Sequence, residues 1–332
     1  MNDSGCDDII PTDVGNPSKG WLFISLLAIA FVTVCCNVYL IFKINRHRVH
    51  KPLTRFFLTS LAFTDLCVGM IIMPFNAYNV SFGSRNIFSN RMCDVMNSFD
   101  VMISSSSIFH LMILTFERYV GLCKPFSYPR WCSIKLSGLL YTGCWSISVC
   151  ISFGLILPGV NYHGVDIHVR ECFNFYMDNT SKCTFIYGRM YMIISSLTTI
   201  FVPMLTIVYL NYKVVTYIRA RCNNQSLGIT GKFANSHRAK CVHIFKILAV
   251  LTVCFLVCWL PFFIANAVVV LSDYSVPYIF YTCLTWLGYL CSTLNPILYI
   301  RFQGKNNRLS AQSSISINLV NTWDVWRSCI LT

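Results

Sequence analysis

The sequence predicts an all-α membrane protein built as a bundle of seven transmembrane helices. Of its 332 residues, 55% are hydrophobic and only 12% are charged, which is too apolar a composition for an ordinary soluble protein. Seven stretches are long and apolar enough to cross a bilayer as helices, for which about 20 residues suffice. These stretches are 21–42, 56–83, 92–116, 136–165, 190–212, 247–272 and 274–300.

Basic residues mark one side of the predicted membrane domain. The segments after the first, third, fifth and seventh stretches contain 20 of the 26 Lys and Arg residues. Because basic residues accumulate on the cytoplasmic side, we expect the N-terminus outside and the C-terminus in the cytoplasm. This asymmetry accounts for the net charge of +13 without a nucleic-acid partner. We expect an outer tail over 1–20, a membrane domain over 21–301, and a short amphipathic helix with a cytoplasmic tail over 302–332.

The third apolar stretch carries charged residues at two positions. Asp100 and Arg118 are 18 residues apart, which is five helical turns, so both side chains point the same way. They are expected to lie about 27 Å apart, with Arg118 next to Glu117. An isolated carboxylate in lipid is costly, so Asp100 is a candidate functional residue whose partner is still to be identified.

A second acid, Asp65, lies near the middle of the second stretch. An acid at mid-depth in a membrane helix usually has a functional partner. Polar residues of other stretches are predicted to converge on Asp65 as a cation or proton site: Ser107, Ser292 and Asn295.

Ser195, Ser196 and Thr199 share one sector of the fifth stretch. They can bond phenolic hydroxyls of a ligand or bond back to the preceding helical turn, and the sequence leaves both interpretations open. Pro203 follows four residues after Thr199 and is predicted to kink this helix, because proline leaves a backbone carbonyl without its N–H partner.

Aromatic residues follow at helical spacing in the last two stretches. In the sixth they surround Pro261, and they serve either as core packing or as a cage for a ligand. The residues concerned are Phe255, Trp259, Phe262 and Phe263, followed by Asn266. In the seventh stretch Trp286 and Tyr289 share a face of the outer half, and Asn295, Pro296 and Tyr299 interrupt the inner half.

Four cysteines lie on the predicted outer side, where an oxidising environment favours disulfides. We predict a Cys93–Cys183 disulfide that draws the long outer loop over the opening of a ligand pocket between the helices, so that Phe185 faces this pocket. Cys172 either pairs with Cys6 or replaces Cys183 as the partner of Cys93. Sequons at Asn2 and Asn179 are predicted glycosylation sites.

Together these residues resemble those of the rhodopsin-like G-protein-coupled receptors, from residue 21 to about residue 309. The motifs that carry the resemblance are Asn37, LAFTD ending at Asp65, Cys93, Glu117-Arg118-Tyr119 with Pro125, Trp145, Pro203, CWLPFF around Trp259 and Pro261, and NPILY from Asn295 to Tyr299. Within that family the chain is similar to biogenic amine and trace-amine-associated receptors, because Asp100 falls where those receptors hold the ligand's ammonium group. Trp286, Gly288 and Tyr289 match their WxGY signature.

The resemblance implies a multi-pass plasma-membrane receptor that binds a small cationic amine and signals through a heterotrimeric G protein. The implied ligand-binding residues are Asp100, Val101, Ser104, Phe185, Ser195, Ser196, Thr199, Trp259, Phe262, Phe263, Asn266, Trp286 and Tyr289. The implied activation residues are Glu117, Arg118, Tyr119, Asn295, Pro296 and Tyr299, with Arg118 expected to pair locally with Glu117. No cofactor is expected other than a sodium ion near Asp65, where Cys291 replaces the Asn of many members.

Other functions fit the sequence less well. A receptor of the same fold for a non-amine ligand, such as a peptide, is the main alternative. A photoreceptor needs a retinal-binding lysine in the seventh stretch, and residues 274–300 contain none. A transporter tends to show internal repeats, which are not evident here. No nucleophile and base stand together, so neither catalytic residues nor a metal site are predicted.

Overall fold

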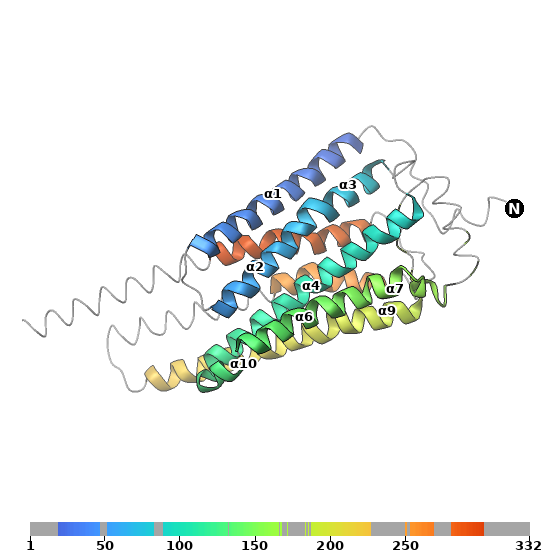
Figure 1. Ribbon diagram of the computed structural model, residues 1–332. Helices are drawn as coiled ribbons and strands as arrows, with labels where there is room; N and C mark the ends of the chain where they lie inside the picture. Colours follow the sequence, from blue (N-terminus) through green and yellow to red (C-terminus); the bar gives the residue numbers. More distant parts are fainter. Residues whose placement is uncertain are drawn as a thin grey trace, which may run out of the picture.

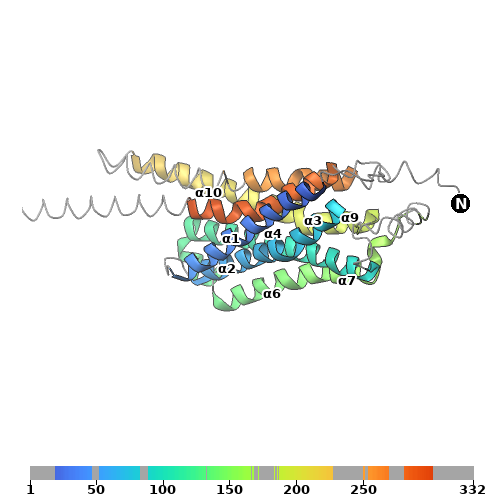
Figure 2. The same ribbon diagram turned by 90° about the horizontal axis from the view of Figure 1, so that it is seen from above.

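The protein is a bundle of long helices that run side by side. The computed structural model describes residues 19–46, 52–82, 89–131, 133–165, 187–226, 253–268 and 280–301, with the single residues 167, 171, 183, 185 and 250. Within these ranges the regular secondary structure is entirely helical. Figures 1 and 2 show the helices forming one elongated body.

The helical elements have the following bounds. The labelled elements are α1 (Lys19–Arg46), α2 (Pro52–Cys67), α3 (Met73–Phe82), α4 (Asn90–Cys123), α5 (Tyr128–Trp131), α6 (Ile134–Ile151), α7 (Phe153–Ile156), α9 (Arg189–Ser196) and α10 (Val202–Ser226). Two further helices follow, Val253–Val268 and Phe280–Arg301. Short 3₁₀ turns occupy Pro125–Ser127 and Val160–Tyr162.

The structure confirms the predicted all-α bundle. Within the described residues, six helical segments are long and apolar enough to cross a membrane, and each overlaps one predicted stretch. The fourth ends at Ile156 rather than at 165, whereas the third and fifth continue to Cys123 and Ala220, beyond the predicted ends at 116 and 212. The sixth predicted stretch, 247–272, is described as a helix only over Val253–Val268. The predicted tails, 1–20 and 302–332, lie almost wholly outside the described residues.

The bundle buries polar side chains and exposes large apolar ones. Asn37, Asp65 and His110 are completely buried, whereas Phe31 and Leu205 on the outer faces are 69% and 65% exposed. This arrangement is the reverse of a water-soluble domain, in which large exposed apolar surfaces are rare. It indicates that lipid covers the outside of the bundle and that the helices satisfy their polar groups against one another.

Helix α4 lies at the centre of the bundle. It packs against α2, α6 and α10, and Figure 1 shows it running obliquely between them. Ser89 caps its first turn by accepting a hydrogen bond from the N–H of Met92. Asp100 and Arg118 both belong to this uninterrupted helix of 34 residues, as the spacing predicted.

Two membrane helices contain a π turn just before a proline. Val68–Ile72 joins α2 to α3, and Leu197–Phe201 joins α9 to α10. In each turn the residue before the proline bonds five residues back: Met73 N–H to Val68 O, and Val202 N–H to Leu197 O. Because proline has no N–H to donate, a wider turn fits here at little cost. The local distortion expected near Pro203 is therefore a π turn that contains Thr199.

Buried hydrogen bonds tie helices that are distant in sequence. The amide of Asn37 donates to the carbonyl of Ser292 at 3.0 Å and so joins α1 to Phe280–Arg301. His110 of α4 bonds Ser60 of α2 at 2.8 Å through its Nε2 atom. Such bonds specify which helices meet, because an apolar lipid offers no alternative partner.

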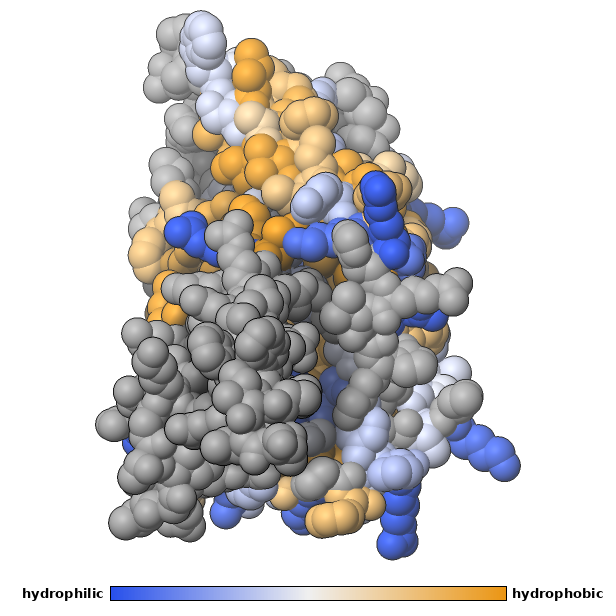
Figure 3. Space-filling view, turned by 90° about the vertical axis from the view of Figure 1, so that its left-hand side faces the viewer, coloured by the Kyte–Doolittle hydropathy of each residue, from blue (hydrophilic) through white to orange (hydrophobic). Residues whose placement is uncertain are grey.

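The two ends of the bundle differ in charge. At the end where α4 finishes, which we call the Arg118 end, Figure 3 shows strongly hydrophilic side chains on the described part of the surface. The exposed basic residues there are Arg46, Lys124, Arg130, Lys135, Lys213, Arg219 and Arg301. At the opposite end, the Cys93 end, the exposed basic residues of the described part are Arg91 and Arg189.

Candidate functional site

A cavity of about 210 Å³ opens between the helices toward the Cys93 end. Its walls come from α3, α4, α9 with its π turn, and the helices Val253–Val268 and Phe280–Arg301. All thirteen residues that the sequence predicted as ligand contacts line it. They come from five separate parts of the chain, so the fold brings together side chains that the sequence only placed on helix faces.

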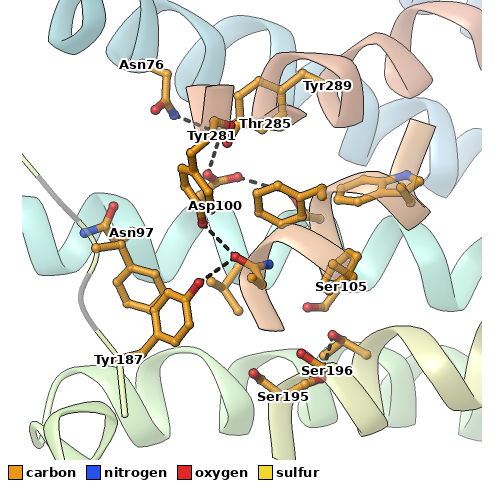
Figure 4. A pocket seen from close by; sticks show the side chains of 18 of the residues that line it. Asn76, Asn97, Asp100, Ser105, Tyr187, Ser195, Ser196, Tyr281, Thr285 and Tyr289 are labelled. Atoms are coloured by element: carbon orange, nitrogen blue, oxygen red, sulfur yellow. Dashed lines mark hydrogen bonds between the residues drawn. The ribbon is translucent and has the colours of Figure 1, made fainter. Parts of the chain in front are cut away.

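Asp100 is the only charged residue among the described residues that line this cavity. Tyr289 donates a hydrogen bond to its Oδ2 atom at 2.5 Å, and Ser104 donates to its Oδ1 atom at 3.2 Å. Asn76 in turn donates to the Tyr289 oxygen at 2.9 Å (Figure 4). With two neutral donors and no cationic partner from the described lining, the carboxylate is ready to bind a cation from solution.

The opposite wall is aromatic. The rings of Phe262 and Phe263 meet edge to face with centroids 5.0 Å apart, and Trp259 lies 6.0 Å from Phe263. Gly288 faces Trp259, and a Cβ atom there would lie 3.4 Å from the indole ring. The sequence left core packing and a ligand cage open, and the structure shows that these rings both pack on the core and face the cavity.

The three predicted hydroxyls of the fifth span all reach the cavity, but they differ in their partners. Ser195 donates to the carbonyl of Met192 at 3.3 Å, and Thr199 donates to the carbonyl of Ser195 at 2.7 Å. Ser196 is buried and makes no hydrogen bond with the described residues. Back-bonding, one of the two open interpretations, therefore applies to Ser195 and Thr199 and not to Ser196.

Asn266 joins three parts of the cavity rim. Its Oδ1 atom accepts hydrogen bonds from Tyr187 at 2.5 Å and from Tyr281 at 2.8 Å (Figure 4). Tyr187 belongs to the segment before α9, and Tyr281 to the helix Phe280–Arg301. The side-chain oxygen of Asn266 thus already accepts two hydrogen bonds, and only the side-chain N–H groups remain to bind a ligand.

The predicted Cys93–Cys183 disulfide is confirmed, with the two Cα atoms 5.4 Å apart. It pins the segment that holds Phe185 against α4, and Phe185 lines the cavity as expected. The alternatives that involve Cys6 and Cys172 lie outside the described residues.

Asp65 and its three predicted partners form a second polar centre. Ser107 and Ser292 donate to its Oδ1 atom at 3.1 and 2.8 Å, and Asn295 donates to its Oδ2 atom at 3.0 Å. The convergence predicted from the sequence is therefore present. A second cavity of about 70 Å³ extends from Asp65 to Arg118.

The local ion pair expected between Glu117 and Arg118 is absent from the described contacts. The Oε1 atom of Glu117 instead accepts hydrogen bonds from Thr54 and Tyr128, each at 2.7 Å. These bonds tie α4 to α2 and α5 through one oxygen of the carboxylate. The sequence could not foresee them, because both donors belong to other helices.

The remaining predicted activation residues also gather at the Arg118 end. Tyr119 packs on Val214 and Ile218 of α10. Asn295, which bonds Asp65, and Tyr299 line the second cavity together with Arg118. Pro296 is buried within the helix Phe280–Arg301. The predicted glycosylation sites Asn2 and Asn179 lie outside the described residues.

Sequence reasoning missed several residues of the cavity wall: Asn76, Asn97, Ser105, Tyr187, Tyr191 and Tyr281. Asn76 and Ser105 carry a detectable signal, since each is a polar residue within a predicted apolar stretch. Tyr187 and Tyr281 carry none, because they lie at helix ends, where aromatic residues are common.

The chain matches the family model described as 7 transmembrane receptor (rhodopsin family) over residues 36–299. It is 31% identical to the 5-hydroxytryptamine receptor 4 of Cavia porcellus, over 86% of this chain and 77% of that protein. It is 27% identical to trace amine-associated receptor 13c of Danio rerio, over 84% of this chain and 81% of the relative. It is 28% identical to octopamine receptor beta-2R of Chilo suppressalis, over 88% of this chain and 80% of that protein.

Proposed function

Because the chain belongs to the rhodopsin family of seven-transmembrane receptors, we propose that it is a receptor for a small cationic amine that signals through a heterotrimeric G protein. The observation that carries this proposal is the carboxylate of Asp100, alone in charge on the described cavity wall and held by Tyr289 and Ser104. The relatives named above, whose names refer to 5-hydroxytryptamine, trace amines and octopamine, support an amine as the ligand.

An ammonium group is the ligand chemistry that this site fits. A charge-assisted hydrogen bond to a carboxylate is roughly twice as strong as a neutral one. The aromatic wall of Trp259, Phe262 and Phe263 offers apolar surface to the remainder of a small aromatic amine. A cavity of about 210 Å³ suits such a ligand better than a peptide.

The Arg118 end is the cytoplasmic end in this proposal. It carries most of the exposed basic side chains of the described residues, which favours the cytoplasmic side of a membrane. The cavity then opens to the outside, under the segment fixed by the Cys93–Cys183 bridge. Ligand binding shifts an existing equilibrium toward a state in which the helix Val253–Val268 swings outward at Pro261 and the cytoplasmic face opens.

Asp100→Asn tests the proposal. Expressed in cells and screened with a panel of arylalkylamines, the wild-type receptor is expected to raise a second messenger, and the variant is expected to lose the response at equal surface expression. Asp94→Asn is the matched control, because Asp94 lies on the same helix and bonds Tyr162 at 3.2 Å outside the cavity lining. Equal potency of the wild type and Asp100→Asn would refute an amine site at this carboxylate.

We propose in addition that the Asp65 centre admits a sodium ion. The carboxylate and the hydroxyl oxygens of Ser107 and Ser292 supply the hard oxygen ligands that this ion prefers. Cys291, which bonds Asn295 at 3.8 Å, adds only a soft sulfur atom. Replacing sodium chloride with N-methylglucamine chloride is expected to raise agonist affinity in the wild type and to leave Ser292→Ala unchanged. An equal response of both proteins would exclude the ion from this centre.

A further inference from the structure

Two buried cysteines from different helices contact each other next to the ligand cavity. Cys258 belongs to the helix Val253–Val268 and is 3% exposed, and Cys291 belongs to the helix Phe280–Arg301 and is 4% exposed. Both are part of one apolar cluster, and their thiols share a hydrogen bond. Figures 1 and 2 show the two helices, in orange and red, side by side. The fold thus brings together two free thiols that are 33 positions apart in the chain.

The thiol pair lies between the two cavities and lines neither of them. Trp259, which lines the ligand cavity, hydrogen-bonds the sulfur of Cys291. On the other side, the Cys291 thiol lies 3.8 Å from the Oδ1 atom of Asn295, which lines the second cavity. One side chain therefore separates Cys291 from each cavity. A neutral reagent little larger than water can approach the pair, whereas a bulky reagent such as glutathione disulfide cannot.

The two thiols connect a helix that moves with one that is held in place. Cys258 precedes Pro261 by three residues, so it belongs to the half of its helix that swings outward in the proposed activation. Cys291 is followed by Ser292, whose hydroxyl donates to Asp65 of α2 at 2.8 Å. A covalent bond between the two sulfurs would therefore fasten the moving half to a helix that is itself bonded into the bundle.

We infer that Cys258 and Cys291 form a redox switch, in which hydrogen peroxide converts the two thiols into a disulfide that holds the receptor in its inactive state. The formation of this disulfide does not depend on the nature of the ligand. Its effect on signalling rests on the proposed function, because it acts on the outward movement of the helix Val253–Val268.

The oxidation takes two balanced steps. In the first, one sulfur attacks a peroxide oxygen, the O–O bond breaks, and the departing hydroxyl takes up the thiol proton as water, which leaves a sulfenic acid. In the second, the other sulfur attacks the sulfenic sulfur, the S–O bond breaks, and the second thiol proton leaves with the hydroxyl as water. Two thiols and one peroxide thus give one disulfide and two waters. Because the thiols are in contact, the second sulfur already lies where the second step needs it.

Peptide mapping of the purified full-length receptor tests whether the disulfide forms. After treatment with hydrogen peroxide, digestion with pepsin at acid pH is expected to release a peptide pair linked through Cys258 and Cys291, detected by mass spectrometry. Glutathione disulfide is expected to give no link. Cys144 is the internal control, because it is equally buried in a cluster that contains no other cysteine, and it is expected to stay unlinked. Free or sulfinic cysteine at positions 258 and 291 of the treated wild type, without a linked pair, would overturn the inference.

G-protein activation in washed membranes tests the effect on signalling. Tyramine, phenethylamine and 5-hydroxytryptamine are the agonists, applied before and after peroxide. The maximal response of the wild type is expected to fall at least about threefold, and that of Cys258→Ala and of Cys291→Ser by less than about 1.5-fold, because neither variant can form the link. Cys144→Ala is expected to lose its response as the wild type does. Equal losses in the wild type and in the two variants would refute the switch.

The two assays distinguish a failure of this inference from a failure of the proposed function. If the amines act but no linked peptides form, the inference fails and the amine receptor stands. If the link forms but no amine acts, the amine proposal fails, and the melting temperature decides whether the link restrains the helices. Peroxide is then expected to raise the melting temperature of the wild type by about 4 °C or more and to leave both variants unchanged. An unchanged wild type would refute the restraint. Surface labelling shows which variants fold, and either single variant alone suffices, because each removes one half of the pair.

Discussion

Asn79 holds the backbone of Cys183 from both ends of its side-chain amide. Its Nδ2 atom donates to the Cys183 carbonyl at 2.8 Å, and its Oδ1 atom accepts from the Cys183 N–H at 3.0 Å. The disulfide partner on α4, Cys93, therefore fixes only the side chain of Cys183, and α3 fixes its backbone. This double attachment makes the segment over the cavity part of the rigid bundle. It also buries Asn79, which stands in an Asn-Val-Ser sequon, away from any glycosylating enzyme.

Asn79→Ala is expected to destabilise the receptor, because it leaves two buried backbone groups of Cys183 without partners. Each unsatisfied buried group costs about 1–3 kcal/mol. Thermal inactivation of ligand binding in detergent measures the loss. Asn97→Ala is the matched control, since Asn97 lines the same cavity and makes no hydrogen bond with the described residues. Equal melting temperatures of the two variants would contradict a structural role for Asn79.

Tyr289→Phe is expected to weaken amine binding without abolishing it. Asn76 donates to the Tyr289 oxygen, so the Tyr289 hydrogen must point to Asp100 and fix the carboxylate. Loss of a hydrogen bond to a charged group costs about 1.5–3 kcal/mol, which corresponds to roughly a 10- to 100-fold rise in Kd. Competition binding on membranes measures this rise in Kd.

Asn76→Ala separates orientation from contact in the same network. It leaves the Tyr289 hydroxyl in place but frees it to rotate, so a smaller loss of affinity than in Tyr289→Phe is expected. A larger loss in Asn76→Ala would mean that Asn76 contacts the ligand itself.

Much of the fold and of the site could be predicted from the sequence, because membrane helices are recognisable as long apolar segments with few polar residues. Asp65 and Asp100 stood out since acids are rare in lipid, and both proved to be centres of hydrogen bonding. The four consecutive serines 104–107 could not be assigned in the same way. Their different roles depend on successive rotations of about 100° around α4 and on the helix that each direction meets.

The parts that the sequence did not reveal are contacts between distant segments. Glu117 was expected beside Arg118, yet Thr54 and Tyr128 compete for its carboxylate from other helices. Ser195, Ser196 and Thr199 looked equivalent as a sector of one regular helix. The π turn that begins at Leu197 and back-bonding to the chain distinguish them, and neither can be read from spacing alone.

Asn266→Leu is expected to speed ligand release more than it reduces stability. The substitution removes the shared acceptor of Tyr187 and Tyr281, and so frees the segment before α9 from the helix Phe280–Arg301. A severalfold faster dissociation rate, measured by radioligand washout, is expected. Tyr281→Phe serves as the comparison, because it removes one of the two bonds and keeps the link to Tyr187. An unchanged rate in Asn266→Leu would show that the rim does not control exchange.

His110 provides the last prediction, since it is completely buried between α2, α4 and α6. Its Nδ1 atom lies 2.5 Å from the carbonyl oxygen of Ser106, so Nδ1 must carry the hydrogen, and Nε2 accepts the hydrogen bond of Ser60 at 2.8 Å. His110→Phe keeps an aromatic ring among Phe57 and Trp145 but leaves the Ser60 hydroxyl without its acceptor. A loss of about 1–3 kcal/mol is expected in thermal inactivation.

A second substitution, at Ser60, decides whether the loss of stability in His110→Phe comes from the missing hydrogen bond or from the different shape of the ring. Ser60→Ala alone removes the donor and is expected to cost about 0.5–1.5 kcal/mol. Ser60→Ala added to His110→Phe is expected to restore part of the stability, because it deletes the unsatisfied hydroxyl, so the two losses do not add. Strict additivity would place the whole effect in the fit of the ring against its aromatic neighbours. The hydrogen bond between Ser60 and His110 would then contribute nothing to holding α2 against α4.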